Sequence, residues 1–302
     1  MRRRFTIKLI LPVAAICAAV AAYAANVSQT APNQAKLLSS LSLELKEPWF
    51  GGLSAVAVDA KGENVTVLTD RSHLLQGKLL RDDGALTGMQ LKAHNQLRNI
   101  WGKEMKSGRD FLDSEGLSVT PDGTIYVSFE GFARVSRYET RTAKAEDLPQ
   151  PRSFRHFGFN KALEGLANDK NGNLYTLPEK APGEGFPVWR WNGRTWQQPF
   201  EVPKSAGYLP VGLDIGPDGR LYLLERKFAL VGFKSRLRRW EIDGDAIRNE
   251  TTLLTTPLGT HGNLEGLSVW QTSTGQLRAA MVSDNNFLSF QKSELVEYQL
   301  PR

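Results

Sequence analysis

The chain has 302 residues with a formal net charge of +6, and 41% of the residues are hydrophobic. Four of the six net positive charges lie within residues 2–8, and the small remainder gives no basis for binding nucleic acid. Its single cysteine, Cys17, lies near the N-terminus, so the remainder of the chain has neither disulfides nor thiol chemistry.

The first 24 residues are predicted to be a signal peptide. A basic region, Arg2–Lys8, precedes an apolar stretch, Leu9–Val20, that is too short to span a bilayer, and Ala22–Ala24 has the small-x-small pattern of a cleavage site. The arginines leave Sec and twin-arginine export both open. We expect a periplasmic or secreted protein in which residues 25–36 form a disordered lead-in, with no later membrane span.

A short phrase recurs five times in the remaining chain. It contains Gly-Leu, a strand, a tight turn, and an apolar strand that ends in an acid. The glycines are Gly52, Gly116, Gly165, Gly212 and Gly266, at intervals of 64, 49, 47 and 54 residues. Turn signals such as Pro121-Asp122-Gly123 and Pro217-Asp218-Gly219 separate the two strands. A period of this length built from strand pairs is typical of a β-propeller.

The intervals predict an all-β fold with five four-stranded blades over residues 37–302, and the 64-residue interval leaves six blades possible. Only 36 residues follow Gly266, so the last blade lacks an outer strand. Leu41–Leu45 alternates suitably to supply it, which would close the ring with strands from both chain ends. Phe154–Leu163 has room for one short helical turn. We expect a monomer.

The acids of the repeated phrase are expected at one end of the propeller, because the innermost strand starts on the face to which the second strand returns. Glu115, Glu164 and Glu265 precede Gly-Leu, and Glu130, Glu179 and Asp284 close the second strands of the same blades. Carboxylates this close cannot all stay ionised without a cation or raised pKa values. An all-oxygen set suits Ca²⁺ best, then Mg²⁺ or Mn²⁺. Glu115, Glu164 and Glu265 are therefore the predicted Ca²⁺ ligands.

The other residues of the phrase suggest catalytic and substrate-binding roles. Glu130, Glu179 and Asp284 are the catalytic candidates, together with His261, which precedes Glu265 by four and could act as a base or proton shuttle. The substrate-binding candidates are Asp70, Arg71, Glu225, Arg226 and Asn285. The alternative is structural: the neighbours Asp70-Arg71, Glu179-Lys180 and Glu225-Arg226 would form ion pairs between blades.

Several of these phrases resemble one protein family. They are Gly51-Gly52-Leu53-Ser54, Asp113-Ser114-Glu115-Gly116-Leu117, Leu163-Glu164-Gly165-Leu166, Leu224-Glu225-Arg226 and Asn263-Leu264-Glu265-Gly266-Leu267 with Ser283-Asp284-Asn285-Asn286. Together they resemble the phytase-like family of exported bacterial proteins, described as having "esterase-like activity of phytase". The resemblance extends from about Phe50 to Tyr298 and implies a propeller that hydrolyses a phosphate or other ester. It supplies no settled catalytic residue, and the aspartate-rich calcium loops of true propeller phytases are missing from this sequence.

The function predicted from the sequence is metal-assisted hydrolysis of a small-molecule ester or anionic substrate, with lactone hydrolysis as a variant. The alternative is a non-catalytic propeller that binds a ligand or protein in the periplasm.

Overall fold

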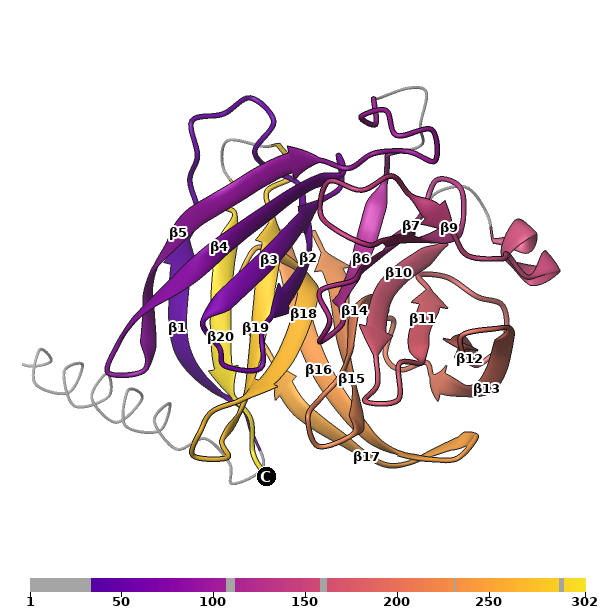
Figure 1. Cartoon of the computed structure of the whole chain (residues 1–302). Helices are drawn as coiled ribbons and strands as arrows, with labels where there is room; N and C mark the ends of the chain where they lie inside the picture. Colours follow the sequence, from indigo (N-terminus) through magenta and orange to yellow (C-terminus); the bar gives the residue numbers. More distant parts are fainter. Residues whose placement is uncertain (1–33, 107–111, 158–161, 231, 288–290) are drawn as a thin grey trace, which may run out of the picture.

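The computed structural model describes residues 34–106, 112–157, 162–230, 232–287 and 291–302. These residues form five four-stranded antiparallel sheets arranged as the blades of a five-bladed β-propeller, which confirms the predicted fold (Figure 1). The alternative of six blades is wrong, because the long first interval is occupied by the extended hairpin of the first blade and the loop after it. The signal peptide and most of the lead-in lie outside the described residues.

Each blade takes its strands from consecutive segments, except the last. Blade 1 contains β2 (Leu53–Val58), β3 (Asn64–Thr69), β4 (His73–Asp82) and β5 (Ala85–Gln96), and blade 2 contains β6 (Ser114–Val119), β7 (Ile125–Phe129), β8 (Arg134–Tyr138) and β9 (Glu146–Asp147). Blade 3 contains β10 (Leu163–Asn168), β11 (Leu174–Pro178), β12 (Gly185–Trp191) and β13 (Trp196–Pro203). Blade 4 contains β14 (Leu209–Ile215), β15 (Arg220–Ala229), β16 (Gly232–Asp243) and β17 (Ala246–Thr255). Blade 5 contains β18 (Asn263–Gln271), β19 (Leu277–Asp284), β20 (Glu294–Gln299) and β1 (Lys36–Ser42). A 3₁₀ helix, η1 (Arg152–His156), precedes blade 3 where the sequence allowed one short turn.

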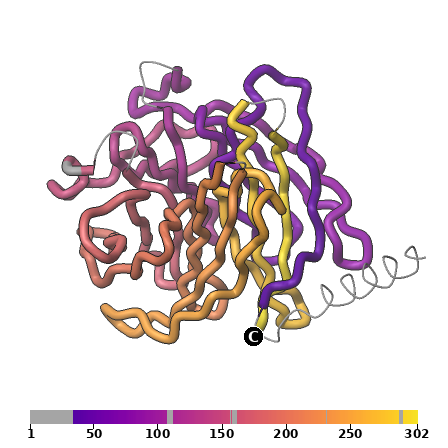
Figure 2. Tube along the Cα trace, turned by 180° about the vertical axis from the view of Figure 1, so that it is seen from behind, coloured from indigo at the N-terminus to yellow at the C-terminus, as the bar shows by residue number. Residues whose placement is uncertain are grey.

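The N-terminal strand closes the ring, as predicted. β1 pairs antiparallel with β20, and the two strands lie side by side in both views (Figures 1 and 2). The strand begins earlier than the predicted Leu41–Leu45: β1 starts at Lys36, and the N–H of buried Ala35 donates to the carbonyl of Leu253 at 2.7 Å. Fully buried Glu297 of β20 accepts hydrogen bonds from Arg81 of blade 1 and Arg278 of β19, which ties blade 5 to blade 1.

Four repeated glycines are explained by the packing between innermost strands. A Cβ added at Gly165 would lie 2.5 Å from the backbone nitrogen of Leu213, and one at Gly212 would lie 2.5 Å from the carbonyl oxygen of Glu265. Gly116 and Gly266 meet the backbone of the following blade in the same way. Neighbouring strands thus pack backbone against backbone, an approach that side chains at these positions would prevent.

The strand register corrects the sequence alignment of two repeats. In blade 2, Glu115 lies in a bulge between Ser114 and Gly116, and in blade 1 the bulge between Leu53 and Ala55 contains Ser54. Ala55, not Gly52, therefore takes the repeated glycine's place. In blade 4, Glu225 pairs with Pro210, just as Phe129 pairs with Ser114 in blade 2, so Arg226 is the counterpart of Glu130.

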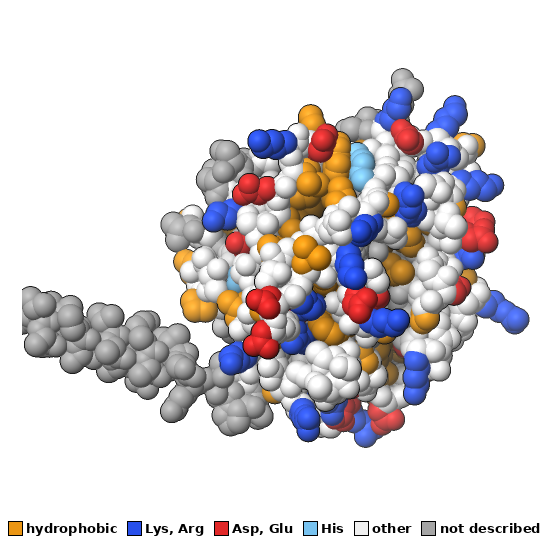
Figure 3. Space-filling model, turned by 60° about the vertical axis from the view of Figure 1, so that its left-hand side comes forward, with side chains coloured by type: hydrophobic (Ala, Val, Ile, Leu, Met, Phe, Trp, Pro, Cys, Tyr) orange, Lys and Arg blue, Asp and Glu red, His pale blue; other side chains and the backbone are white. Residues whose placement is uncertain are grey.

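The surface shown in Figure 3 carries lysine and arginine side chains interspersed with acidic ones, together with a stripe of apolar side chains. An apolar cleft of about 240 Å³ lies between the N-terminal segment and blade 1 and is lined by Leu43, Leu75 and Met89 among others. No helix in the described part of the chain is long and apolar enough to cross a membrane.

Candidate functional site

Two sets of repeat positions meet where the innermost strands begin. The bulge positions of blades 1 to 5 hold Ser54, Glu115, Glu164, Val211 and Glu265. The positions that close the second strands hold Asp70, Glu130, Glu179, Arg226 and Asp284. We call these acids, together with Asp113, Asn263, Arg71, Lys180 and Arg226, the acidic mouth. The predicted convergence of acids is therefore seen in the fold.

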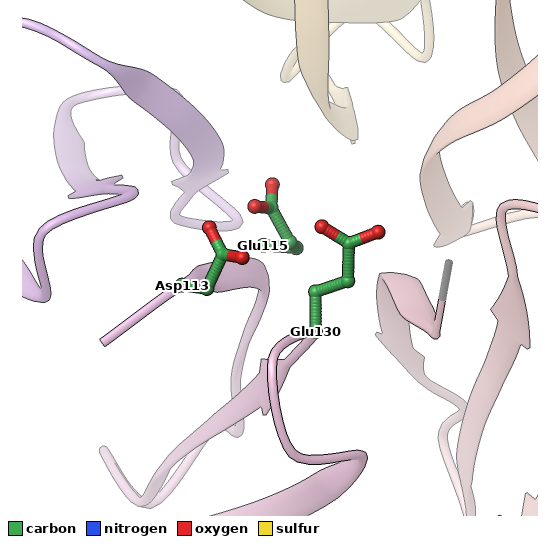
Figure 4. A group of neighbouring side chains, drawn as sticks. All are labelled: Asp113, Glu115 and Glu130. Atoms are coloured by element: carbon green, nitrogen blue, oxygen red, sulfur yellow. The ribbon is translucent and has the colours of Figure 1, made fainter. Parts of the chain in front are cut away.

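Two groups of three carboxylates lie close enough for each group to hold a cation. One oxygen from each of Asp113, Glu115 and Glu130 lies within 4.8 Å of the others, and Figure 4 shows these carboxyl groups next to one another. Glu130, Glu164 and Glu179 form a second group with the same limit. Glu130 belongs to both groups, so the acids of blades 2 and 3 form one continuous cluster.

Burial and mutual repulsion raise the pKa values of these acids. Burial, followed by repulsion from Asp113 and Glu179, raises the pKa of Glu130 to about 7, although Arg226 and Lys180 act in the opposite direction. Burial also raises the pKa of Asp70 to about 7, and the charge of Asp284 adds to this effect.

The bulge acids are affected in the same way. Burial raises the pKa of Glu115 and Glu164 well above the ordinary range, and the surrounding carboxylates raise it further. Burial raises the pKa of Glu265 to about 8 although Arg226 opposes the shift. The mouth therefore cannot be fully ionised near neutral pH unless a cation enters it.

Arg226 is the one cation built into the ring of repeat positions. Its guanidinium donates to Glu265 and to Asn263 Oδ1 (2.9 Å), and it lies 3.5 Å from Glu179. Burial would lower the pKa of Arg226, but the charges of Glu265 and Glu164 outweigh this and raise it. Arg226 thus joins blades 3, 4 and 5, although its partners are Glu179 and Glu265 rather than the neighbouring Glu225. Lys180 pairs with Glu179 at 3.0 Å and is half exposed.

The residues at the junction of blades 5 and 1 include a carboxylate without a partner. Asp70 Oδ1 is buried and makes no hydrogen bond among the described residues, and it packs against Gly52, whose φ of +61° favours glycine. Asn285 Oδ1 accepts the N–H of Gly52 and of Phe287, each at 3.1 Å. The exposed Arg71 lies over the Phe287 ring, 3.4 Å from its centre. Asn285 therefore supports the loop beside Asp70.

Glu225 lies outside the mouth, and the prediction that it contacts a substrate does not agree with its position. The residue is fully buried, and its carboxylate accepts hydrogen bonds from Arg236 and Arg238, each at 2.8 Å. Successive side chains in a strand point to opposite faces, so Glu225 points away from the mouth when Arg226 points into it. Arg226 is the blade 4 residue that faces the acids.

His261 is also placed apart from the acids by its contacts. Its Nε2 lies 2.6 Å from the hydroxyl of Tyr298, its Nδ1 lies 3.9 Å from Glu294, and burial lowers its pKa. Both partners belong to β20, and no interaction found among the described residues joins His261 to Glu265. Its contacts indicate a role in packing blade 5 rather than in proton transfer at the mouth.

Asp113 and Asn263 are members of the mouth that the sequence analysis did not select. Asp113 belongs to the first carboxylate group, and Asn263 donates to Glu265 at 2.7 Å. Each stands two residues before a bulge acid, Glu115 or Glu265. That spacing was the available signal.

The opposite ends of the innermost strands surround a second feature, a cavity of about 1170 Å³. It is lined by the hairpin turns of the blades and by residues such as Asp59, Asp169, Asp214 and Arg190. None of the sequence-predicted site residues lines it.

These features define the protein as a five-bladed propeller with a carboxylate cluster at one end of its inner strands. The family model described as "Phytase-like: Esterase-like activity of phytase" matches residues 48–287, and the chain belongs to this family. No curated protein matches the sequence.

Several solved structures match the chain at low sequence identity. A protein of unknown function from Dyadobacter fermentans has 12% identity and a TM-score of 0.50, with 89% of this chain and 99% of that chain covered. Virginiamycin B lyase from Staphylococcus aureus has 16% identity and a TM-score of 0.42 (89% and 75% covered). The PQQ-bound aldose sugar dehydrogenase from Streptomyces coelicolor has 13% identity and a TM-score of 0.46 (88% and 99% covered). At such identities the comparison extends to the fold alone.

Proposed function

We propose that the protein is an exported hydrolase of an ester or phosphoester that works with a divalent cation, Ca²⁺ first, bound at the acidic mouth. One observation carries the proposal. Glu130 and Glu164 are only 9% and 6% exposed, and their carboxylates have neither a hydrogen bond nor an ion pair among the described residues. A buried carboxylate without a partner is costly, and a cation would compensate for that cost.

The donors present fit a hard cation. Glu115, Glu130 and Glu164 offer only carboxylate oxygens, the ligands that Ca²⁺ prefers. Glu265, a predicted ligand, already accepts hydrogen bonds from Arg226 and Asn263, so we assign it to holding Arg226. When bound, such a cation supplies polarisation of an ester oxygen and acidification of a water molecule.

The remaining residues would bind the substrate and move protons. Asp284 lies beside Asp70, and Asp70 has a pKa of about 7, which suits a general base at neutral pH. Arg71 is exposed at the edge of the mouth and is free to bind an anionic group of the substrate while it lies over Phe287. Glu179, held by Lys180 and Arg226, would complete the ligand set. The family description, esterase-like activity, agrees with this reaction class.

A second candidate is a non-catalytic propeller that binds a ligand or protein at the same mouth. The ion pairs of Arg226 with Glu179 and Glu265 favour it, because they use two of the acids to join blades. Turnover that depends on the cation separates the two functions.

The experiment that tests cation binding is a thermal melt of protein treated with chelator and then titrated with Ca²⁺. We expect a saturating rise in Tm, equivalent to about 2.7 kcal/mol at a hundred times Kd. Glu164→Gln should reduce the rise, whereas Glu63→Gln, which removes an exposed acid at the other end of the inner strands, should not. A flat titration of the unaltered protein contradicts the proposal.

Activity is tested with p-nitrophenyl acetate and p-nitrophenyl phosphate, each with Ca²⁺ and with chelator. Turnover that requires Ca²⁺ and is lost in folded Glu164→Gln supports the hydrolase. Saturable cation binding without turnover on a broad panel of esters would favour the binding propeller instead.

A further inference from the structure

The carboxylates of the mouth are unevenly distributed around the ring. Asp113, Glu115 and Glu130 belong to blade 2, and Glu164 and Glu179 belong to blade 3. The opposite part of the ring contains Arg226 and its partner Glu265. The five acids of blades 2 and 3 form the acidic half of the mouth, and Arg226 reaches this half at Glu179, 3.5 Å away.

The acidic half has the arrangement of two adjoining sites. Each group of three carboxylates has its oxygens within 4.8 Å of one another, and the groups share only Glu130. A carboxylate has two oxygens, so a shared glutamate can contact a cation on each side. Two-metal sites in enzymes hold their ions about 3.5–4 Å apart, a distance that one bridging carboxylate spans.

The charges of the mouth residues that the structure describes favour more than one cation. Its acids are Asp70, Asp113, Glu115, Glu130, Glu164, Glu179, Glu265 and Asp284, and its cations are Arg71, Lys180 and Arg226. With every acid ionised, these eight negative and three positive charges leave a net charge of −5. One divalent ion would reduce this to −3 and two would reduce it to −1.

Buried side chains without partners occur in both groups. The carboxylates of Glu130 and Glu164 accept no hydrogen bond in the described part of the chain. Glu130 belongs to both groups, and Glu164 belongs to the second. A single ion in the second group would leave Asp113 and Glu115 without a cation between them, and a single ion in the first group would leave Glu164 without one.

We propose that the mouth binds two divalent cations bridged by Glu130, one held with Asp113 and Glu115 and the other with Glu164 and Glu179. This inference rests on the proposed function, because it assumes that the mouth binds cations. It extends that function by giving Asp113 a ligand's role and Glu130 a bridging role in place of a catalytic one.

The test counts Ca²⁺ ions bound to the purified, chelator-treated chain, by equilibrium dialysis with elemental analysis and by calorimetric titration. We expect two ions per chain. Asp113→Asn and Glu164→Gln should each bind one ion, and Glu130→Gln should weaken both ions at least tenfold. These near-isosteric replacements remove carboxylate repulsion and should leave the fold intact, which circular dichroism checks. Glu63→Gln, the matched control, should bind two.

The outcomes separate the inference from the proposed function. One ion in the unaltered protein, or two ions retained in both Asp113→Asn and Glu164→Gln, overturns the two-cation site and leaves a metal-assisted hydrolase intact. No bound ion at all overturns both, and would mean that shared protons rather than cations relieve the repulsion.

Discussion

The two ends of the inner strands are built from the same five repeats, but several acids differ between the ends in whether backbone N–H groups donate to them. At the turn end, Asp59 accepts the N–H of Glu63 at 2.8 Å and of Asn64 at 3.1 Å, and Asp169 accepts those of Asn171 and Asn173 at 2.8 and 2.9 Å. At the mouth, Glu130 and Glu164 are buried without such donors. The turn acids therefore stabilise the local backbone, whereas ionised acids without donors at the mouth destabilise the folded chain when no cation is bound.

The pKa values follow this difference. Burial alone would raise the pKa of Asp59, but hydrogen bonds from Asn64 and Glu63 lower it below the ordinary value. The carboxylate of Glu130 accepts no hydrogen bond in the described part of the chain, and burial raises its pKa although the charges of Arg226 and Lys180 oppose the shift. Asp214 lies at the turn end and burial raises its pKa to about 7, yet its oxygens accept the N–H of Ile215 and Val269. The proposed cation site therefore rests on acids that lack donors rather than on burial alone.

The largest expected effect is the pH dependence of the cation-free protein. Glu130 and Asp70 have raised pKa values in the folded state, so the folded chain binds more protons than the unfolded chain between about pH 4 and pH 7. Stability should therefore fall as pH rises through this range, by about 3 kcal/mol for Glu130 alone. Saturating Ca²⁺ should abolish the fall. Urea unfolding at pH 5, 6.5 and 8 measures it, and stability that rises with pH without Ca²⁺ would contradict the assignment.

A substitution at a fully partnered acid should give the next largest effect. Glu225→Ala leaves Arg236 and Arg238 buried without their carboxylate, which should cost about 3–5 kcal/mol in the free energy of unfolding. The loss should be equal with and without Ca²⁺, because Glu225 points away from the mouth. A loss that Ca²⁺ restores would place Glu225 in the cation site.

A substitution at an acid without a hydrogen-bond partner should increase, rather than decrease, the free energy of unfolding of the cation-free protein. Glu130→Gln removes a buried charge that repels Asp113 and Glu179, so the cation-free protein at pH 8 should gain about 1–3 kcal/mol. With Ca²⁺ the variant should be less stable than the unaltered protein. Chemical unfolding in the two conditions shows whether the order of stabilities reverses, and the same order in both would argue against cation binding.

The smallest effect is expected at the turn end. Asp169→Ala removes acceptors for the N–H groups of Asn171 and Asn173, at a cost of about 1 kcal/mol. Its Ca²⁺ titration should match that of the unaltered protein. A changed Ca²⁺ response would mean that the two ends of the inner strands are coupled.

The sequence predicts the fold better than the site because different features determine them. The repeated glycines and turns define the blades, and the missing outer strand implies closure by the N-terminus. The site depends on strand register, where a shift of one residue moves a side chain to the other face. Glu225 and Arg226 are such neighbours, and the bulge that decides between them leaves no mark in the sequence. The partner of His261, Tyr298, is 37 residues away and becomes its neighbour only in the folded blade.

The closing blade also determines when the ring can form. Lys36 of β1 pairs with Gln299 of β20, so the first described strand can pair only after the last one has been synthesised. Nearly the whole chain must therefore be present before blade 5 is complete. A chain that emerges N-terminus first, from a ribosome or a translocation channel, therefore holds β1 unpaired until β20 follows. Closure of the ring thus requires both β1 and β20, because a chain that lacks either strand leaves blade 5 incomplete and the ring open.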